Sequence, residues 1–174
     1  MMGAAHTESD VDIRIITELT SKYKDLDIAI TTPEWDEEKK NYKKVVNWTK
    51  KPKVNGAATL KDKQLIIRNT DLYSEIDWDI FKYLEPWQVQ YIKNKLPKTL
   101  EFGRDGKGHS LYKIKNLPEK VESIKRLDLG ERTILEYRGL GCYSIFAGAL
   151  DKTSKATVAV TEITEIDYKY LKKL

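Results

Sequence analysis

Residues 75–80 of the chain read Glu-Ile-Asp-Trp-Asp-Ile, so acidic and apolar side chains alternate along this stretch. A period of two residues is typical of a β-strand that buries one face and exposes the other. Successive side chains of a strand point to opposite sides, and we therefore expect Asp77 and Asp79 on one face and Trp78 in the core. The stretch predicts a sheet that carries two neighbouring carboxylates.

The segments on either side of this strand predict a fold that mixes helices and strands. Helices are expected at 11–23, 37–48, 86–95 and 166–174, and strands at 29–32, 64–68, 99–102, 109–114, 132–137, 142–147 and 156–161. Helices and strands are interleaved at first, and strands dominate later. This order favours an α+β (mixed α/β) plan.

The composition is that of one intracellular domain. The 174 residues are 40% hydrophobic, carry a net charge of +4 and contain a single cysteine and two histidines. One cysteine excludes a disulfide framework, and no apolar run reaches the roughly 20 residues of a membrane span. We expect a cytoplasmic protein in which residues 1–10 are a disordered or vector-derived start and residues 11–174 form a single domain.

The paired carboxylates of Asp77 and Asp79 favour a divalent metal ion. Two adjacent carboxylates repel each other and raise each other's pKa, and a bound cation removes that cost. Mg²⁺ binds carboxylates together with water and phosphate oxygens, and two such ions can catalyse phosphoryl transfer. An Asp-x-Asp pair on the solvated face of a strand is also common without any metal, so the pair alone leaves both interpretations open.

A second stretch, residues 102–112, reads Phe-Gly-Arg-Asp-Gly-Lys-Gly-His-Ser-Leu-Tyr and predicts a hairpin with a basic tip. Glycines allow a phosphate to approach the backbone, and Arg104 and Lys107 supply positive charge beside His109. The alternative is a hairpin tip whose charges only increase solubility.

Two further features are weaker. Residues 135–141 read Leu-Glu-Tyr-Arg-Gly-Leu-Gly, in which Glu136 is either an exposed strand residue or a third metal ligand. A basic loop at 50–53 contains Lys51 and Lys53, which contact nucleic-acid phosphates or form a solvated turn.

Taken in order, the three motifs resemble the primase-polymerase family of the archaeo-eukaryotic primase superfamily, near viral and plasmid proteins in which this domain precedes a helicase. That family has an acid-x-acid strand, a basic glycine turn that leads into a histidine, and a later strand with one acid. Here 30 residues separate Asp79 from His109, and 27 separate His109 from Glu136. The resemblance implies an RRM-like sheet that carries the active site and a smaller N-terminal α/β lobe.

The resemblance also implies roles for individual residues. Asp77, Asp79 and Glu136 would bind Mg²⁺ or Mn²⁺ and act in catalysis, and the arginine after the third acid would assist the site or pair with Glu136. The residues implied to bind the nucleotide are Arg104, Lys107, His109, Ser110 and Arg138. The implied substrates and partners are a single-stranded DNA template with its primer, a dNTP or NTP, and a helicase domain in a full-length protein. No membrane partner is implied.

The sequence departs from the family pattern at three places. Lys107 stands where a serine is frequent, and the stretch after the third motif lacks the usual prolines. The segment that leads into the first motif, residues 69–72, lacks the usual glycine-rich run. Asp71 is an alternative acid if the strand register differs. Two other functions stay open: a non-catalytic nucleic-acid-binding module of the same fold, and a metal-dependent nuclease that uses the same acids.

Overall fold

The computed structural model describes residues 13–32, 34–43, 64–78, 84–104, 107–118, 124–129, 132–150, 155–159 and 162–171. Within these residues the fold is α+β, with mostly antiparallel strands and a few helices, as the sequence predicts. Three predicted site residues lie outside the described residues: Asp79, Lys51 and Lys53.

The described helices are short and the strands are numerous. The helices are α1 (Ile13–Lys22), α2 (Pro86–Lys93) and α3 (Tyr168–Leu171). The strands are β1 (Asp27–Thr31), β2 (Glu34–Asp36), β3 (Asn41–Lys43), β4 (Gln64–Arg68), β5 (Tyr73–Asp77), β6 (Leu100–Arg104), β7 (Lys107–Lys115), β8 (Ile124–Leu129), β9 (Arg132–Arg138), β10 (Tyr143–Ala149), β11 (Lys155–Ala159) and β12 (Thr164–Asp167).

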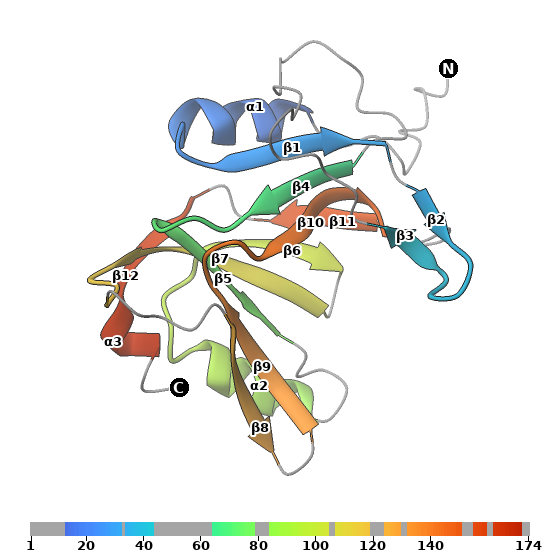
Figure 1. Cartoon of the computed structure of the whole chain (residues 1–174). Helices are drawn as coiled ribbons and strands as arrows, with labels where there is room; N and C mark the ends of the chain where they lie inside the picture. The colour runs from blue at the N-terminus through green and yellow to red at the C-terminus, as the bar shows by residue number, and fades with distance from the viewer. Residues whose placement is uncertain are drawn as a thin grey trace, which may run out of the picture.

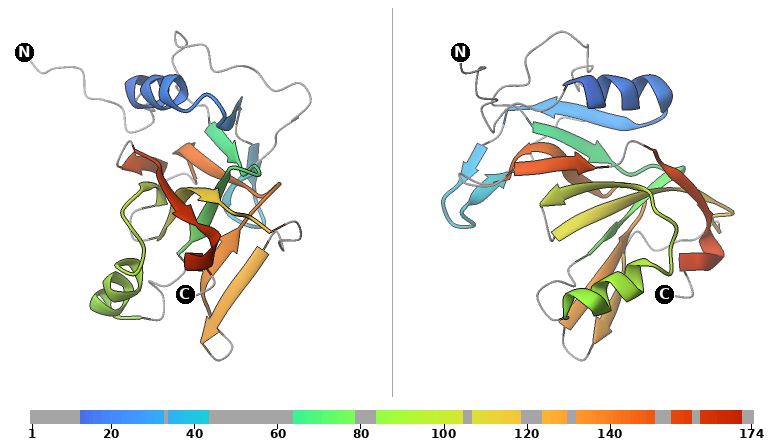
Figure 2. Two further views of the ribbon diagram at one scale, coloured as in Figure 1. Left: turned by 90° about the vertical axis from the view of Figure 1, so that its left-hand side faces the viewer. Right: turned by 180° about the vertical axis from the view of Figure 1, so that it is seen from behind.

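Ten of the described strands form one bent sheet (Figure 1). Its order is β1-β4-β10-β11-β6-β7-β5-β9-β8, and β12 pairs with β7 in parallel. The portion β1-β4-β10 lies above the portion β6-β7-β5-β9-β8, and β11 joins the two because it pairs with both β10 and β6 (Figures 1 and 2). The bend brings strands that are distant in the sequence into contact across the fold.

The largest hydrophobic core lies between these two portions of the sheet. Residues of α1 and of both sheet portions form one buried cluster: Leu19, Ile28, Leu65, Ile67, Tyr73, Leu100, Phe102, Leu111, Phe146 and Ala147. Phe146 of β10 is fully buried and lies 5.0 Å from the Phe102 ring of β6, between ring centroids. This contact ties the two portions together.

A second core covers the opposite face of β5 and β7. Ile76 and Trp78 pack there against Val89 of α2 and Ile166 of β12. The Trp78 indole N–H donates to the Ser110 hydroxyl at 2.7 Å, and the Tyr137 hydroxyl donates to Ser74 at 3.0 Å. Both bonds join neighbouring strands on this face. Figure 1 shows α2 and α3 on the side of the sheet away from α1.

The predicted helix over 37–48 is wrong for its described part, because β2 and β3 form a hairpin there. The Asp36 carboxylate accepts hydrogen bonds from the backbone N–H groups of Glu38 and Lys39, and Lys40 has a φ of 52°. A side chain that bonds the backbone two and three residues on stabilises a turn rather than a helix. Trp35 and Tyr42 then pack edge to face across the hairpin, 5.1 Å apart.

The predicted C-terminal helix over 166–174 is confirmed at Tyr168–Leu171 and wrong at its start, because residues 164–167 form β12. Residues 172–174 lie outside the described residues. Ile166 is buried against β7, so its burial, and not helical spacing, decides the conformation.

The strand β8 was not predicted, although the two residues between Leu129 and Arg132 are the length of a tight hairpin loop.

The other predicted elements are confirmed with small changes at their ends. β4 spans the predicted residues, and α2 ends two residues early. Arg104 and Lys107, which were expected in the glycine-rich turn, pair as strand residues of β6 and β7. In the described parts of the chain, no helix is long and apolar enough to cross a membrane.

Replacing Phe146 with alanine should strongly destabilise the protein, because it removes the ring that joins the two sheet portions. We expect a loss of about 3–5 kcal/mol in the free energy of unfolding, measured by urea titration. The exposed Leu140 provides the control, and its alanine variant should change stability by no more than about 0.5 kcal/mol. Similar losses for both variants would contradict the assigned core.

Candidate active site on the sheet

The centre of the site is Asp77, the last residue of β5. In the register of the sheet Asp77 pairs with His109 of β7 on one side and with Glu136 of β9 on the other. Directly opposed residues of antiparallel strands have Cα atoms about 4.5–5.5 Å apart and side chains on the same face. Three residues from three separate sequence motifs therefore stand in one row across the sheet.

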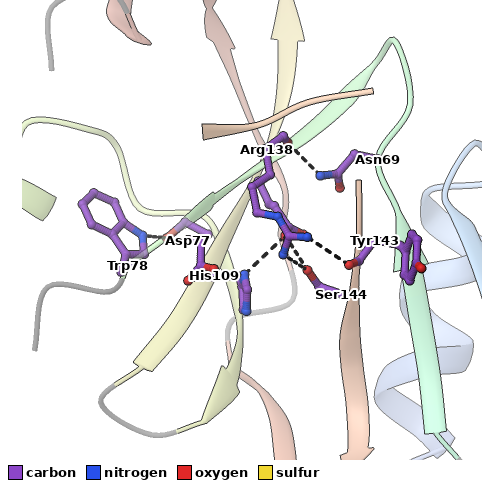
Figure 3. Close-up of polar contacts among 9 residues, drawn as sticks. Asn69, Asp77, Trp78, His109, Arg138, Tyr143 and Ser144 are labelled. Atoms are coloured by element: carbon purple, nitrogen blue, oxygen red, sulfur yellow. Dashed lines mark hydrogen bonds and ion pairs between the residues drawn. The ribbon is translucent and has the colours of Figure 1, made fainter. Parts of the chain in front are cut away.

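Behind this row lies a fully buried carboxylate, that of Glu75. Glu75 is two residues before Asp77 and so shares its face of β5. One oxygen, Oε1, lies 3.0 Å from Nη1 of Arg138 and 3.4 Å from Nδ1 of His109. The same oxygen accepts a hydrogen bond from the Ser144 hydroxyl. Figure 3 shows the side chains of His109, Arg138 and Ser144 converging on this point.

Arg138 links β9 to β10. Its Nη1 donates to the Ser144 hydroxyl at 2.7 Å, and its Nη2 donates to the Tyr143 carbonyl at 3.2 Å. The backbone carbonyl of Arg138 accepts a hydrogen bond from the side-chain amide of Asn69 at 2.7 Å. The backbone N–H of Asn69 also donates to the Cys142 carbonyl, in the turn between β9 and β10. The arginine is thus fixed by both ends (Figure 3).

His109 is held between a ring and two carboxylates. Its imidazole stacks on Phe102, with ring centroids 4.9 Å apart and planes 9° from parallel. Its Nδ1 lies 3.4 Å from Glu75 and 4.0 Å from Asp77. The side chains of His109 and Asp77 stay partly accessible, at 18% and 24% exposure, whereas Glu75 has none. Solvent or a ligand can reach the row but not the carboxylate behind it.

The charges of this cluster shift one another's protonation. Burial opposes the charged form of His109, but the neighbouring Glu75 and Asp77 outweigh it and raise the pKa of His109 above its ordinary 6.5. Burial likewise opposes ionisation of Glu75, yet His109, Arg138 and the Ser144 hydroxyl outweigh it and lower the pKa of Glu75. The two shifts therefore favour the ionised form of Glu75 and the protonated form of His109.

The structure brings together some of the predicted site residues and separates others. Asp77, His109, Glu136 and Arg138 share one face. Ser110 is on the opposite face, is buried and accepts the Trp78 indole bond, so it is not placed to contact a nucleotide at this row. Asp71 lies in the exposed turn before β5, at the opposite end of the strand from Asp77.

Two predicted basic positions, Arg104 and Lys107, form the last pair of the β6–β7 hairpin. Lys107 is two residues from His109 along β7, so the two positions share a face of that strand. The hairpin tip therefore stands at the same end of the sheet as the row.

Sequence reasoning missed Glu75 and Ser144. Glu75 is part of the alternating stretch, and its place two residues before Asp77 was a signal that it shares the face of the predicted acid pair. Nothing local indicates Ser144, because its partners are six and 69 residues away in the sequence.

The donor set of the row suits a hard cation. Carboxylate oxygens are the preferred protein ligands of Mg²⁺ and Mn²⁺, and Asp77 and Glu136 supply them side by side. The described residues contain no group of three or more His, Cys, Asp or Glu side chains arranged to hold a metal, and Asp79 is outside them.

Comparisons with known proteins return no assignment. No protein-family model matches the sequence, and no curated protein matches it.

In the metal-free protein, the His109 ring protons should titrate by NMR with a midpoint above 6.5. Because folding raises this pKa, the contribution of protonated His109 to stability is fully present below about pH 6.5 and is lost as pH rises through the folded-state value. Glu75→Gln should lower the midpoint.

The control for this titration is Glu101→Gln. Glu101 is on the neighbouring strand β6, pairs with Ser110 and so belongs to the opposite face. Its variant should leave the midpoint unchanged. A wild-type midpoint at or below 6.5 would contradict the ion pair.

Proposed function

We propose that this protein is a nucleotidyltransferase that joins nucleotides on a single-stranded template, as a DNA primase or DNA polymerase of the archaeo-eukaryotic primase type. The observation that carries the proposal is the row of Asp77, His109 and Glu136 on adjacent strands β7, β5 and β9. These residues come from the three motifs on which the resemblance rests. Acids that are merely exposed on separate strands need not pair with the histidine of a basic glycine hairpin, whereas an active site of the primase type requires this pairing.

The order of the strands also supports the proposal. β5, β6, β7 and β9, taken as the first to fourth strands of a unit, are arranged as fourth-first-third-second, with α2 connecting the first two. This is the arrangement of an RRM-like sheet. One difference is that the connection from β7 to β9 contains the strand β8 at the place of a second helix. The portion β1-β4-β10 with α1 would be the smaller lobe.

Asp77 and Glu136 fit the role of metal ligands, with Asp79 as the predicted third. Carboxylate oxygens are the protein ligands that Mg²⁺ and Mn²⁺ prefer, and Asp77 and Glu136 stand opposite each other in the register of the sheet. When bound, such ions activate the attacking 3′-hydroxyl and offset the charge of the leaving pyrophosphate.

The chain's own residues would position the nucleotide. His109 stacks on Phe102 beside Asp77, and its protonated form would place positive charge where an incoming triphosphate needs it. Arg138 is paired with Glu75 and bonded to Ser144. Its main role would therefore be to orient the site and add positive potential, and direct phosphate binding would be secondary. Arg104 and Lys107 at the hairpin tip would hold the distal phosphates.

The test is primer extension on a single-stranded template with Mg²⁺ or Mn²⁺, comparing dNTPs with NTPs and reactions with and without primer. We expect Asp77→Asn and Glu136→Gln each to lower the rate by about 100-fold or more, because each removes a charge that acts on the reacting phosphate. Glu165→Gln, an exposed acid of β12, is the matched control and should retain full activity. Undiminished synthesis by the Asp77→Asn, Glu136→Gln double variant would refute the proposal.

The same samples separate the two alternative functions. Labelled DNA that is degraded with metal and without nucleotides would indicate a nuclease. Nucleic-acid binding with no metal-dependent nucleotide binding would indicate a non-catalytic module.

A further inference from the structure

The helix α2 exposes two large aromatic rings. Trp87 is 70% exposed and Tyr91 is 65% exposed. They are four residues apart and so lie on the same face of the helix, about 6 Å from each other along its axis. The opposite face of α2 holds the buried Val89, which packs in the core with Trp78. The helix therefore has an inner apolar face and an outer aromatic one.

Lysines accompany these rings. Lys95 is four residues after Tyr91, and its Nζ lies 5.3 Å from the centroid of the Tyr91 ring. Lys98 follows in the exposed segment after the helix. Two described acids lie nearby: Glu85 is the exposed N-cap residue of α2, and Glu101 pairs with Lys93 at 3.5 Å. The outer face of α2 thus combines two ring faces with positive charge.

The composition of this face points to one kind of ligand. The aliphatic side chains of α2 and its C-terminal turn, Val89, Ile92 and Leu96, belong to the inner core and do not contribute to the exposed face. The amides of Gln90 and Asn94, which bond each other at 2.7 Å, lie in the row beside the rings. A face that docks another protein helix would instead present aliphatic residues at helical spacing. Bases stack on aromatic rings, and phosphates attract lysines.

We propose that the outer face of α2 binds single-stranded nucleic acid, with one base stacked on Trp87, another on Tyr91, and Lys95 near a phosphate. α2 packs on the side of β5 opposite to Asp77, because Val89 of α2 shares a core with Trp78, and the side chains of Asp77 and Trp78 alternate between the two faces. A nucleic-acid segment bound to α2 would therefore lie on the other side of the sheet from the row of Asp77, His109 and Glu136. Its role as a tether for the template rests on the proposed function, whereas the binding itself does not.

The test measures binding of a labelled oligo(dT) by fluorescence anisotropy, without nucleotides and with divalent metal removed. Trp87→Ala and Tyr91→Ala should each weaken binding by about 5- to 100-fold. Trp87→Phe keeps a stacking surface and should restore most of the affinity. Lys95→Ala should reduce the slope of log K against log salt by about 0.7.

The matched control is Tyr170→Ala on α3. Tyr170 is also exposed and also has a lysine beside it, with Nζ of Lys169 at 5.6 Å from the ring centroid. This variant should bind like the wild type, and an equal loss would overturn the proposal. Wild-type affinity in the Trp87→Ala, Tyr91→Ala double variant would overturn it as well. So would concentration-dependent self-association that Trp87→Ala abolishes, because a second copy would then be the occupant.

Primer extension separates this proposal from the proposed function. If the α2 variants bind oligo(dT) weakly while the wild type makes no product, the binding face stands and the polymerase assignment falls. If the wild type extends primers and the α2 variants need no more template for half-maximal rate, the polymerase assignment stands and the tether role of the face falls.

Discussion

The buried carboxylate of Glu75 is the charge around which the site is built, because an ion enclosed in a protein interior must be paired and hydrogen-bonded. Its partners come from three strands: His109 from β7, Arg138 from β9 and Ser144 from β10. Satisfying one carboxylate therefore fixes strands from both portions of the sheet relative to each other. Loss of one cationic partner from such a buried pair typically costs about 3–5 kcal/mol.

The two faces of β5, β7 and β9 perform different tasks. One face presents Asp77, His109 and Glu136, and the other holds the indole bond from Trp78 to Ser110 and the bond from Tyr137 to Ser74. A slip of one residue in a strand would exchange the two faces. The bonds of the buried face therefore maintain the register on which the accessible face depends. The positions of the site residues on one face therefore depend on the packing of the other face.

Alternation within 75–80 was enough to predict the strand and the face of Asp77, because a period of two residues has a direct geometric meaning. His109 and Glu136 could be singled out only by the order of the motifs, and their contact with Asp77 depends on pairing between distant strands. Asp36 stabilises a turn that charge composition did not reveal, and the burial of Ile166 decides a strand where apolar spacing suggested a helix. Ser144 has no local signal, since its role exists only after β10 meets β9 and β5.

The pairing of β5 with β7 and β9 also determines when the site can exist. Its strands span residues 73 to 149, and none of the pairs that define the row is local in sequence. Closing loops of this length before the contacts form is slow, so sheets of distant strands fold late compared with local hairpins. A complete chain that has not yet paired these strands would contain each motif and yet lack the site. The row is therefore assembled only when the sheet itself is complete, which prevents partly folded chains from presenting it.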